Sequence, residues 1–355
     1  MDKRWTKLGD LLVNYSMAVK PGEKVMIAFV ELESYPLLHS IYRACIKAGA
    51  FPQVQFLSEE LNRLTLQYGN PDQIGWVPEI EAYGMEWADV YFGLRGAHNL
   101  DVFWDVPAEK LSLLRKGMGA VSTLRWQKTR WCLLRVPNAA LAQQAGVDEE
   151  TITDMFFNAC LLDWQTVSQQ WCRWADVLNR GKQVRVVGKG TDLSFSVEGR
   201  MWDVADGHWN MPDGEIATSP LESTLDGSIY FDYPGVLGGR LVHDIKLCWE
   251  HGKLIEVSSS TNQDFLQSVV KTDAGASLIG EFAIGTNPEV KHFCRDILMD
   301  EKIDGTIHIA LGRAYPKVGG TNQSSIHWDI IKDMRQGGQI FLDGKLIYQN
   351  GKMLI

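Results

Sequence analysis

The residues best suited to chemistry lie in the C-terminal half of the chain. His308 and His327 occur there with Asp329, and the glutamates Glu215 and Glu281 each follow a glycine. Residues two apart in a β-strand point to the same face, so His327 and Asp329 could bind one ion. Two imidazoles and three carboxylates suit a pair of divalent cations that share a carboxylate and activate a water molecule.

Each of these residues also has a simpler interpretation. A lone histidine in strand-like sequence is more often a hydrogen-bonded core residue, and His-x-Asp is a short, common pattern. Glu301 precedes Lys302 in sequence typical of surface turns. Tyr315, before Pro316, could be a packed phenol or could donate a hydrogen bond to an oxyanion. The combination is therefore more informative than any single member.

The composition is that of an ordinary globular protein. The 355 residues, 45% of them apolar and 22% charged, are too many for one typical core and predict two domains. The net charge of −9 argues against a nucleic-acid surface and against docking on an anionic membrane. We find neither a signal peptide nor a membrane span. Six scattered cysteines without a Cys-x-x-Cys pair predict reduced thiols in a cytoplasmic protein.

The first half of the chain alternates between strand and helix patterns. Apolar strands are expected at 25–30, 53–57, 88–94 and 131–136, and helices at 8–17 and 35–48. This alternation predicts an α/β N-terminal domain with a parallel sheet. No Gly-x-Gly-x-x-Gly follows a strand, so no dinucleotide cofactor is expected. A long helical region over about 148–178 completes this half.

The second half changes to short strands separated by Gly, Asn and Asp. The strands are expected at 183–187, 193–197, 227–232, 247–250, 254–258, 306–310 and 339–342. One helix, at about 261–273, interrupts them. The sequence therefore predicts a mainly antiparallel-β C-terminal domain that carries the metal site. The expected domains are residues 1–180 and 181–355.

Several segments resemble one family closely, the dinuclear metallo-aminopeptidases of the aminopeptidase T, aminopeptidase S and PepS type. In the C-terminal half they are residues 210–215, 280–288, 301–308 and 325–329, and in the N-terminal half 12–16, 21–25 and 156–160. The resemblance spans nearly the whole chain, and the C-terminal motifs are highly specific in this combination and order.

The resemblance implies an active site with two divalent ions per chain, which could be zinc, cobalt, manganese or magnesium. The implied metal ligands are Glu215, Glu281, His308, His327 and Asp329, and Glu301 matches a further acidic position whose role stays open. Glu281 would bridge the ions or act as general base, and Tyr315 would polarise the scissile carbonyl or stabilise the tetrahedral intermediate. The family further implies a small peptide or aminoacyl substrate and a homodimer.

Two alternatives remain beside this reading. The chain is shorter than the roughly 400 residues of such peptidases, and relatives of similar length include a non-haem iron dioxygenase that opens a dihydroxypyridine ring. That enzyme keeps a His…His-x-Asp set, whereas the additional Glu215 and Glu281 favour two hard divalent ions over one iron. The other alternative is a metal-binding or ligand-binding protein without catalysis. The sequence predicts a metal-dependent aminopeptidase ahead of both.

Overall fold

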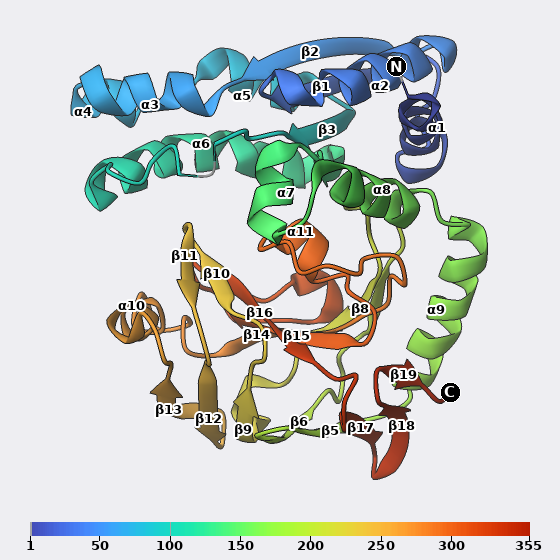
Figure 1. Ribbon diagram of the computed structural model, residues 1–355, viewed down its shortest axis with the longest axis vertical. Coiled ribbons are helices and arrows are strands. Elements are labelled where there is room, and N and C mark those ends of the chain that lie inside the picture. The colour runs from blue at the N-terminus through green and yellow to red at the C-terminus, as the bar shows by residue number, and fades with distance from the viewer. Residues whose placement is uncertain (1, 100) are drawn as a thin grey trace. The chain divides into compact units, whose positions relative to one another are not determined.

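The computed structural model describes residues 2–99 and 101–355, and the chain divides into two units with different sheets (Figure 1). The N-terminal unit runs to Leu161 and includes Gly207–Pro212, and the C-terminal unit consists of Leu162–Asp206 and Asp213–Ile355. The break therefore precedes the residue near 180 at which the sequence placed it. The division into domains 1–180 and 181–355 stays a prediction, because compactness does not test which segments fold independently.

A four-stranded parallel sheet forms the centre of the N-terminal unit. Its strands β1 (Lys24–Val30), β2 (Phe51–Leu57), β3 (Val90–Arg95) and β4 (Arg130–Arg135) are ordered β2-β1-β3-β4. The helices are α1 (Lys3–Leu11), α2 (Tyr35–Lys47), α3 (Glu59–Tyr68), α4 (Pro71–Ile74), α5 (Glu79–Trp87), α6 (Ala108–Lys128), α7 (Ala139–Ala145) and α8 (Glu149–Cys160). The chain moves from β1 to β2 in one direction across the sheet and then returns past β1 to β3 and β4. Because parallel crossovers are right-handed, α2 lies on one face of the sheet, and α5 and α6, which pack together, lie on the other.

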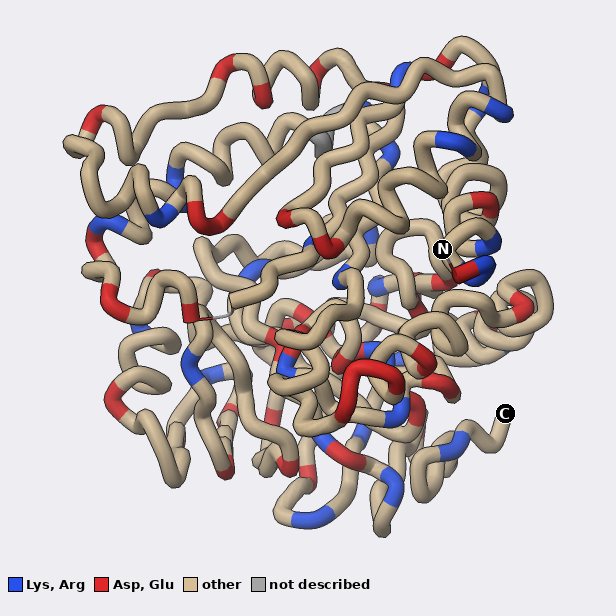
Figure 2. The backbone as a smooth tube through the Cα atoms, turned by 45° about the horizontal axis from the view of Figure 1, so that its top comes forward, with Lys and Arg blue, Asp and Glu red and all other residues tan. Residues whose placement is uncertain are grey.

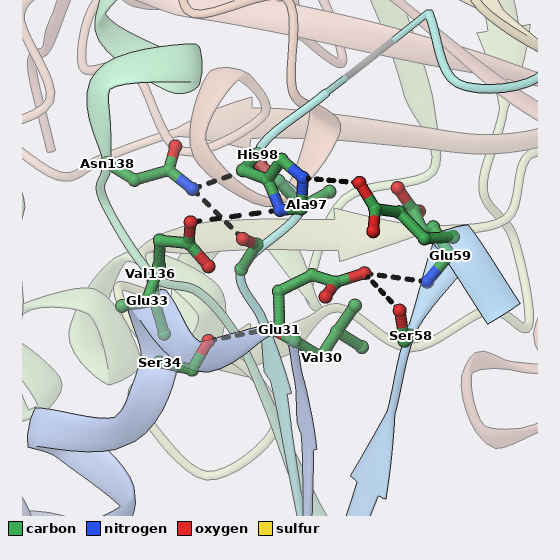
Figure 3. Close-up of polar contacts among 12 residues, drawn as sticks. Val30, Glu31, Glu33, Ser34, Ser58, Glu59, Ala97, His98, Val136 and Asn138 are labelled. Atoms are coloured by element: carbon green, nitrogen blue, oxygen red, sulfur yellow. Dashed lines mark hydrogen bonds and ion pairs between the residues drawn. The ribbon is translucent and has the colours of Figure 1, made fainter.

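Polar side chains connect the carboxyl ends of these parallel strands (Figure 3). The carboxylate of Glu31, after β1, accepts hydrogen bonds from Ser58 Oγ at 2.9 Å and Glu59 N at 2.7 Å. Asn138, after β4, donates to the carbonyl oxygens of Gly96 and Ala97 at 3.0 Å each. These bonds provide partners for Glu31 and Asn138, two of the buried polar residues at this edge.

The helical region predicted over about 148–178 consists of two helices. Helix α8 ends at Cys160, and α9 (Trp164–Leu178) begins a new helix in the C-terminal unit. The reason is Asp163, whose side chain accepts hydrogen bonds from Thr166 N at 3.3 Å and Thr166 Oγ1 at 2.6 Å. An aspartate in this position caps a helix N-terminus and favours a fresh start over continuation.

The C-terminal unit is built from antiparallel sheets (Figure 1). One sheet has the order β13-β12-β9-β6-β5-β17-β18-β19, a second has the order β16-β15-β14-β8-β7, and β10 pairs with β11. The strands are β5 (Gln183–Gly188), β6 (Thr191–Ser196), β7 (Asp203–Ala205), β8 (Glu215–Thr218), β9 (Asp226–Tyr230), β10 (Gly235–Leu237), β11 (Arg240–Val242), β12 (Lys246–Glu250), β13 (Lys253–Ser258), β14 (Ile279–Gly285), β15 (Thr306–Gly312), β16 (His327–Asp333), β17 (Gln339–Leu342), β18 (Lys345–Gln349) and β19 (Lys352–Met353). Two short helices, α10 (Gln263–Val269) and α11 (Ile297–Asp300), complete the unit. The predicted fold class, a parallel α/β part followed by an antiparallel-β part, is confirmed.

The two large sheets share a core, and Phe282 lies at its centre. This fully buried side chain of β14 packs against Phe195 of β6, with ring centroids 5.0 Å apart, and edge-on against Trp202 at 6.0 Å. Successive residues of a strand point to opposite faces. Phe282 therefore fixes β14 against the larger sheet while its neighbour Glu281 points to the other face.

The charged residues are interspersed along the chain. Figure 2 shows Lys and Arg distributed among Asp and Glu rather than gathered in one segment. No helix in the described ranges has the length and apolar character needed to cross a membrane.

Replacing Phe282 with alanine tests the role of this core contact. We expect Phe282→Ala to lower the free energy of unfolding by about 3–5 kcal/mol, the usual cost of emptying a buried aromatic site. Ile255→Ala is the control, because Ile255 is 55% exposed on β13, and its cost should stay within about 0.5 kcal/mol. Urea unfolding of both variants measures the difference, and equal losses would contradict the central position of Phe282.

Candidate metal centre

Neighbouring strands of the five-stranded sheet present the site residues on one face. In this sheet Ala310 of β15 pairs with Glu281 of β14 on one side and with Asp329 of β16 on the other. Side chains directly opposite each other lie on the same face, so the three form a row across the strands. The alanine in the middle leaves open the space between the two carboxylates.

The two histidines and Glu215 join the same face through the period of two. His308 lies two residues before Ala310 on β15, and His327 lies two residues before Asp329 on β16. Ala217 of β8 pairs with Ala283 of β14. Glu215 lies two residues before Ala217, and Glu281 lies two residues before Ala283, so both glutamates are on the same face. The register of four strands therefore gathers five of the predicted site residues.

The gathered side chains form two groups in which one atom of each residue lies within 4.8 Å of the others. One group is Glu281, His327 and Asp329, and the other is Glu215, Glu301 and His308. Asp329 Oδ1 lies 3.3 Å from His327 Nε2 and 3.9 Å from His308 Nε2, so it faces both groups. The groups are therefore adjacent, and Asp329 lies between them.

A buried lysine lies beside the second group. Lys302 Nζ is 2.7 Å from Glu215 Oε1, 2.8 Å from Glu301 Oε1 and 3.2 Å from Asp213 Oδ1. The side chains of Lys302 and Asp213 are both 0% exposed. Burial lowers the pKa of Lys302, but the three carboxylates outweigh it and hold this pKa well above its ordinary value.

Asn287 holds this lysine segment beside Glu215. Its backbone N donates to Lys302 O at 2.9 Å, its backbone O accepts from Asp304 N at 3.2 Å, and its side-chain amide donates to Asp213 O at 2.7 Å. Gly214 permits the close approach, because at φ 129° a Cβ there would lie 2.8 Å from Asn287 Cβ. The segments 213–215 and 301–304 are thereby joined.

His327 is oriented by a backbone carbonyl. Its Nδ1 lies 2.7 Å from Arg313 O, which fixes Nδ1 as the donor and leaves Nε2 facing Glu281 Oε2 and Asp329 Oδ1, each at 3.3 Å. Tyr315 Oη lies 3.4 Å from the same Nε2, with its ring edge-on at 5.0 Å. In its neutral form, a histidine held in this way presents the lone pair of Nε2 to the site.

Burial and opposite charge shift the titration of these groups. Burial raises the pKa of Glu281 against the lowering effect of His327. Burial also acts on Asp329, yet His327 outweighs it and the pKa of Asp329 falls to about 2. Burial lowers the pKa of His327, but Asp329 and Glu281 raise it well above its ordinary value. The pKa of the Tyr315 phenol is raised well above its usual range, first by burial and then by the carboxylates, so it keeps its proton.

The donor set fits divalent cations. Among the described residues, Glu215 Oε2, Asp329 Oδ1 and His308 Nδ1 are buried without a hydrogen-bond partner. Unsatisfied buried polar atoms are rare, and two of these three belong to carboxylates that face imidazole nitrogens. Oxygen and imidazole ligands in this mixture suit zinc, manganese, cobalt and similar ions.

The structure thus brings all seven predicted site residues into one region, and their roles as ligands or catalysts stay predictions. Glu281 lies within strand β14, and Glu301 is 12% exposed, so the simpler interpretation of Glu301 as an open surface-turn residue does not hold. Sequence reasoning missed Lys302 and Asp213 as site residues. Their only signal was adjacency to the motifs around Glu301 and Glu215.

Comparison with known proteins agrees with this geometry. The family model described as thermophilic metalloprotease (M29) matches residues 1–353. The chain belongs to this family. It is therefore an enzyme of a metalloprotease family, and its curated relatives are aminopeptidases.

Four comparisons show the distance to known proteins. Aminopeptidase AmpS of Bacillus subtilis is 24% identical over 96% of each chain, and aminopeptidase T of Thermus thermophilus is 24% identical over 91% of this chain and 90% of that protein. The solved structure of wild-type AmpT from Thermus thermophilus superposes with a TM-score of 0.89 over 99% of each chain at 21% identity. A 2,5-dihydroxypyridine dioxygenase from Pseudomonas putida KT2440 shares the fold with a TM-score of 0.61 at 15% identity, over 99% of this chain and 96% of that one.

Asp273 anchors the segment that leads into His327, and this anchor is pH-dependent. Its carboxylate accepts from Ser325 N at 2.8 Å, Ser325 Oγ at 2.7 Å and Ser324 Oγ at 2.8 Å, which lowers the pKa of Asp273 to about 2. A lowered pKa stabilises the fold above the ordinary value of 3.8, and this contribution is lost as the pH falls towards 2. Asp273→Asn should therefore cost about 1 kcal/mol at pH 6 and less at pH 3.

The measurement is urea unfolding of Asp273→Asn and wild type at both pH values. Asp176→Asn, at an exposed position of α9, is the control and should follow wild type throughout. A deficit of Asp273→Asn that does not shrink at pH 3 would contradict the assigned cause.

Proposed function

We propose that the chain is a metal-dependent aminopeptidase that removes N-terminal residues from peptides, using water activated by two divalent ions. The observation that carries this proposal is the pair of adjacent ligand groups, Glu281–His327–Asp329 and Glu215–Glu301–His308. Each group offers three donors, and an ion bound by three protein ligands keeps a position for water or substrate. Membership of a metalloprotease family whose curated relatives are aminopeptidases supports the peptide substrate.

The charge of the site favours two ions over one. Five carboxylates lie in this region with one lysine: Asp213, Glu215, Glu281, Glu301, Asp329 and Lys302. With every carboxyl group ionised and both histidines neutral, the form in which imidazole binds a metal, the net charge is minus four, which two divalent cations balance and one does not. Uncompensated charge is costly in a buried region, so the electrostatics support a dinuclear site.

The distances favour Asp329 as the carboxylate shared by the two ions. Its Oδ1 faces both His327 and His308, whereas Glu281 Oε2 lies 3.3 Å from His327 alone among the described ion pairs. The sequence allowed Glu281 to be a bridge or a general base. If Asp329 is shared, Glu281 need not bridge: it would bind one ion through one carboxylate oxygen and would be available as the base through the other.

The proposed mechanism assigns a separate task to each residue. Bound divalent ions would lower the pKa of the attacking water and polarise the scissile carbonyl. Glu281 would accept the proton of that water and pass it to the leaving amine. Tyr315, which keeps its phenolic proton, would donate a hydrogen bond to the developing oxyanion. His327 is held by Arg313 O in the orientation that this arrangement needs.

Metal analysis and a substrate screen test the proposal together. Purified protein would be analysed for bound metal and then assayed on aminoacyl amides and short peptides with added zinc, cobalt, manganese or magnesium. Two divalent ions and metal-dependent release of N-terminal residues are expected. One iron per chain with ring-cleaving activity would favour the dioxygenase alternative, and bound metal without any turnover would favour the non-catalytic one.

A homodimer is a further proposal, and the family resemblance implies it. A homodimer is supported by the exposed apolar side chains of the edge strand β2, where Phe51, Val54 and Phe56 are 62%, 44% and 47% exposed. Such surfaces on soluble proteins commonly mark protein contacts. A cytoplasmic location stays a prediction from the cysteine pattern.

Substitution of Glu281 tests the assigned base. Glu281→Gln removes the proton acceptor while keeping the shape of the side chain, so kcat should fall by at least about 10²-fold. Steady-state kinetics at saturating metal give the rate, and metal analysis shows whether the ions remain bound. Glu250→Gln, exposed at the end of β12, is the control. Near-normal turnover of metal-loaded Glu281→Gln would exclude Glu281 as the base.

Substitution of Tyr315 separates a catalytic from a packing role. Tyr315→Phe deletes only the hydroxyl, and loss of one oxyanion donor typically lowers kcat by about 10²–10³-fold. A purely structural phenol would instead cost about 1 kcal/mol of stability with little effect on kcat. Kinetics and thermal unfolding of the same variant distinguish these results. An unchanged kcat with a lowered Tm would remove Tyr315 from the mechanism.

A further inference from the structure

The two ligand groups differ in one respect, which is the position of Lys302. Its ammonium contacts one oxygen of Glu215 at 2.7 Å and one oxygen of Glu301 at 2.8 Å, and both belong to the same group. In the part of the chain that the structure describes, the ion pairs of Glu281 and Asp329 involve histidines only. One group is therefore partly neutralised by a fixed cation, and the other is not.

The two carboxylate oxygens of Glu215 have different partners. Oε1 is bound to Lys302 Nζ, whereas Oε2 lies 3.5 Å from His308 Nε2, buried and without a hydrogen-bond partner among the described residues. Only Oε2 is left to face an ion. Since Glu301 likewise gives Oε1 to the ammonium, both acids of this group share their charge with Lys302.

We propose that Lys302 makes the two metal positions unequal, so that the ion at Glu215, Glu301 and His308 is weakly held and exchangeable. The ion at Glu281, His327 and Asp329 is then the tightly held one. This inference rests on the dinuclear site proposed above and assigns Lys302 as a residue that sets metal affinity through Glu215 and Glu301.

The physical argument is electrostatic. A divalent cation that enters the Glu215 group approaches an ammonium whose side chain is 0% exposed, so bulk solvent screens its charge little. The same ammonium withdraws charge from both carboxylates of the group. A neutral partner would only orient these ligands and strengthen binding, whereas a cation in this position opposes the second ion while keeping its ligands in place.

Titration of the wild-type chain with zinc alone tests the inequality. In competition with a chromophoric chelator, we expect two binding steps whose dissociation constants differ by at least about tenfold, within the range over which neighbouring groups tune metal sites. His308→Ala should remove the weaker step and leave the tighter one. His327→Ala should remove the tighter step. Equal steps in the wild type, or the reverse assignment, would overturn the proposal.

Neutral variants of Lys302 test the cause. Lys302→Met removes the charge, and Lys302→Gln removes it but keeps a hydrogen-bond donor, so both should tighten the weaker step by about tenfold or more. Lys332→Met is the matched control, because Lys332 is also 0% exposed and hydrogen-bonded to Asp232 at 3.1 Å in the same unit. Both steps of Lys332→Met should equal those of wild type.

The outcomes keep this proposal separate from the proposed function. Weaker or unchanged zinc binding in the Lys302 variants would overturn it, even if the wild type hydrolyses peptides. Two unequal steps in a protein that hydrolyses no aminoacyl substrate would refute the aminopeptidase and leave this inference standing. If neither Lys302 variant folds, the wild type with His308→Ala and His327→Ala still decides the inequality.

Discussion

The structure of the C-terminal unit depends on one constraint, which is the placement of five carboxylates in a largely buried region. Each carboxylate loses favourable hydration on burial, and neighbouring ones repel each other. Only cations and hydrogen-bond donors can offset this cost, and the chain itself supplies Lys302 and two imidazoles. Because these offset only part of the charge, the arrangement is built for ions from solution.

The sheet solves the problem of bringing these groups together by register rather than by sequence proximity. Glu281, Ala310 and Asp329 are far apart in the chain but form one row across three strands. The pairing register of β14 and β15 shifts between Ile279 and Glu281, directly before this row. Behind this row, Phe282 packs into the core shared with the larger sheet. The rigid side of the sheet therefore supports the charged side, which is what a preorganised site requires.

The sequence predicted much of this and missed parts for identifiable reasons. The parallel and antiparallel halves followed from apolar patterns, but several strands were not predicted, among them β8, β14 and β16, which carry site residues. Strand β14 is buried along its whole length, so no apolar–polar alternation marks it. Asp163 is a typical helix N-cap residue and marks the start of α9, but the helical spacing of the apolar residues continues across it. The ligand candidates came from motif resemblance. Lys302 resembled a surface residue in the sequence, because its burial depends on contacts with residues far from it in the chain, such as Asn287.

The same scaffold accommodates different chemistry, so the side chains on the site face must decide the reaction. A dioxygenase shares this fold with a TM-score of 0.61, and fold alone does not determine function. One histidine–carboxylate group, such as His327 with Glu281 and Asp329, offers three donor atoms to a single ion. The second group, Glu215, Glu301 and His308, together with Lys302 and Asp213, would be an electrostatic burden without a second ion to bind. This second group lies partly on the fully buried strand β15, and it is the strongest structural reason to expect two-ion chemistry from this chain.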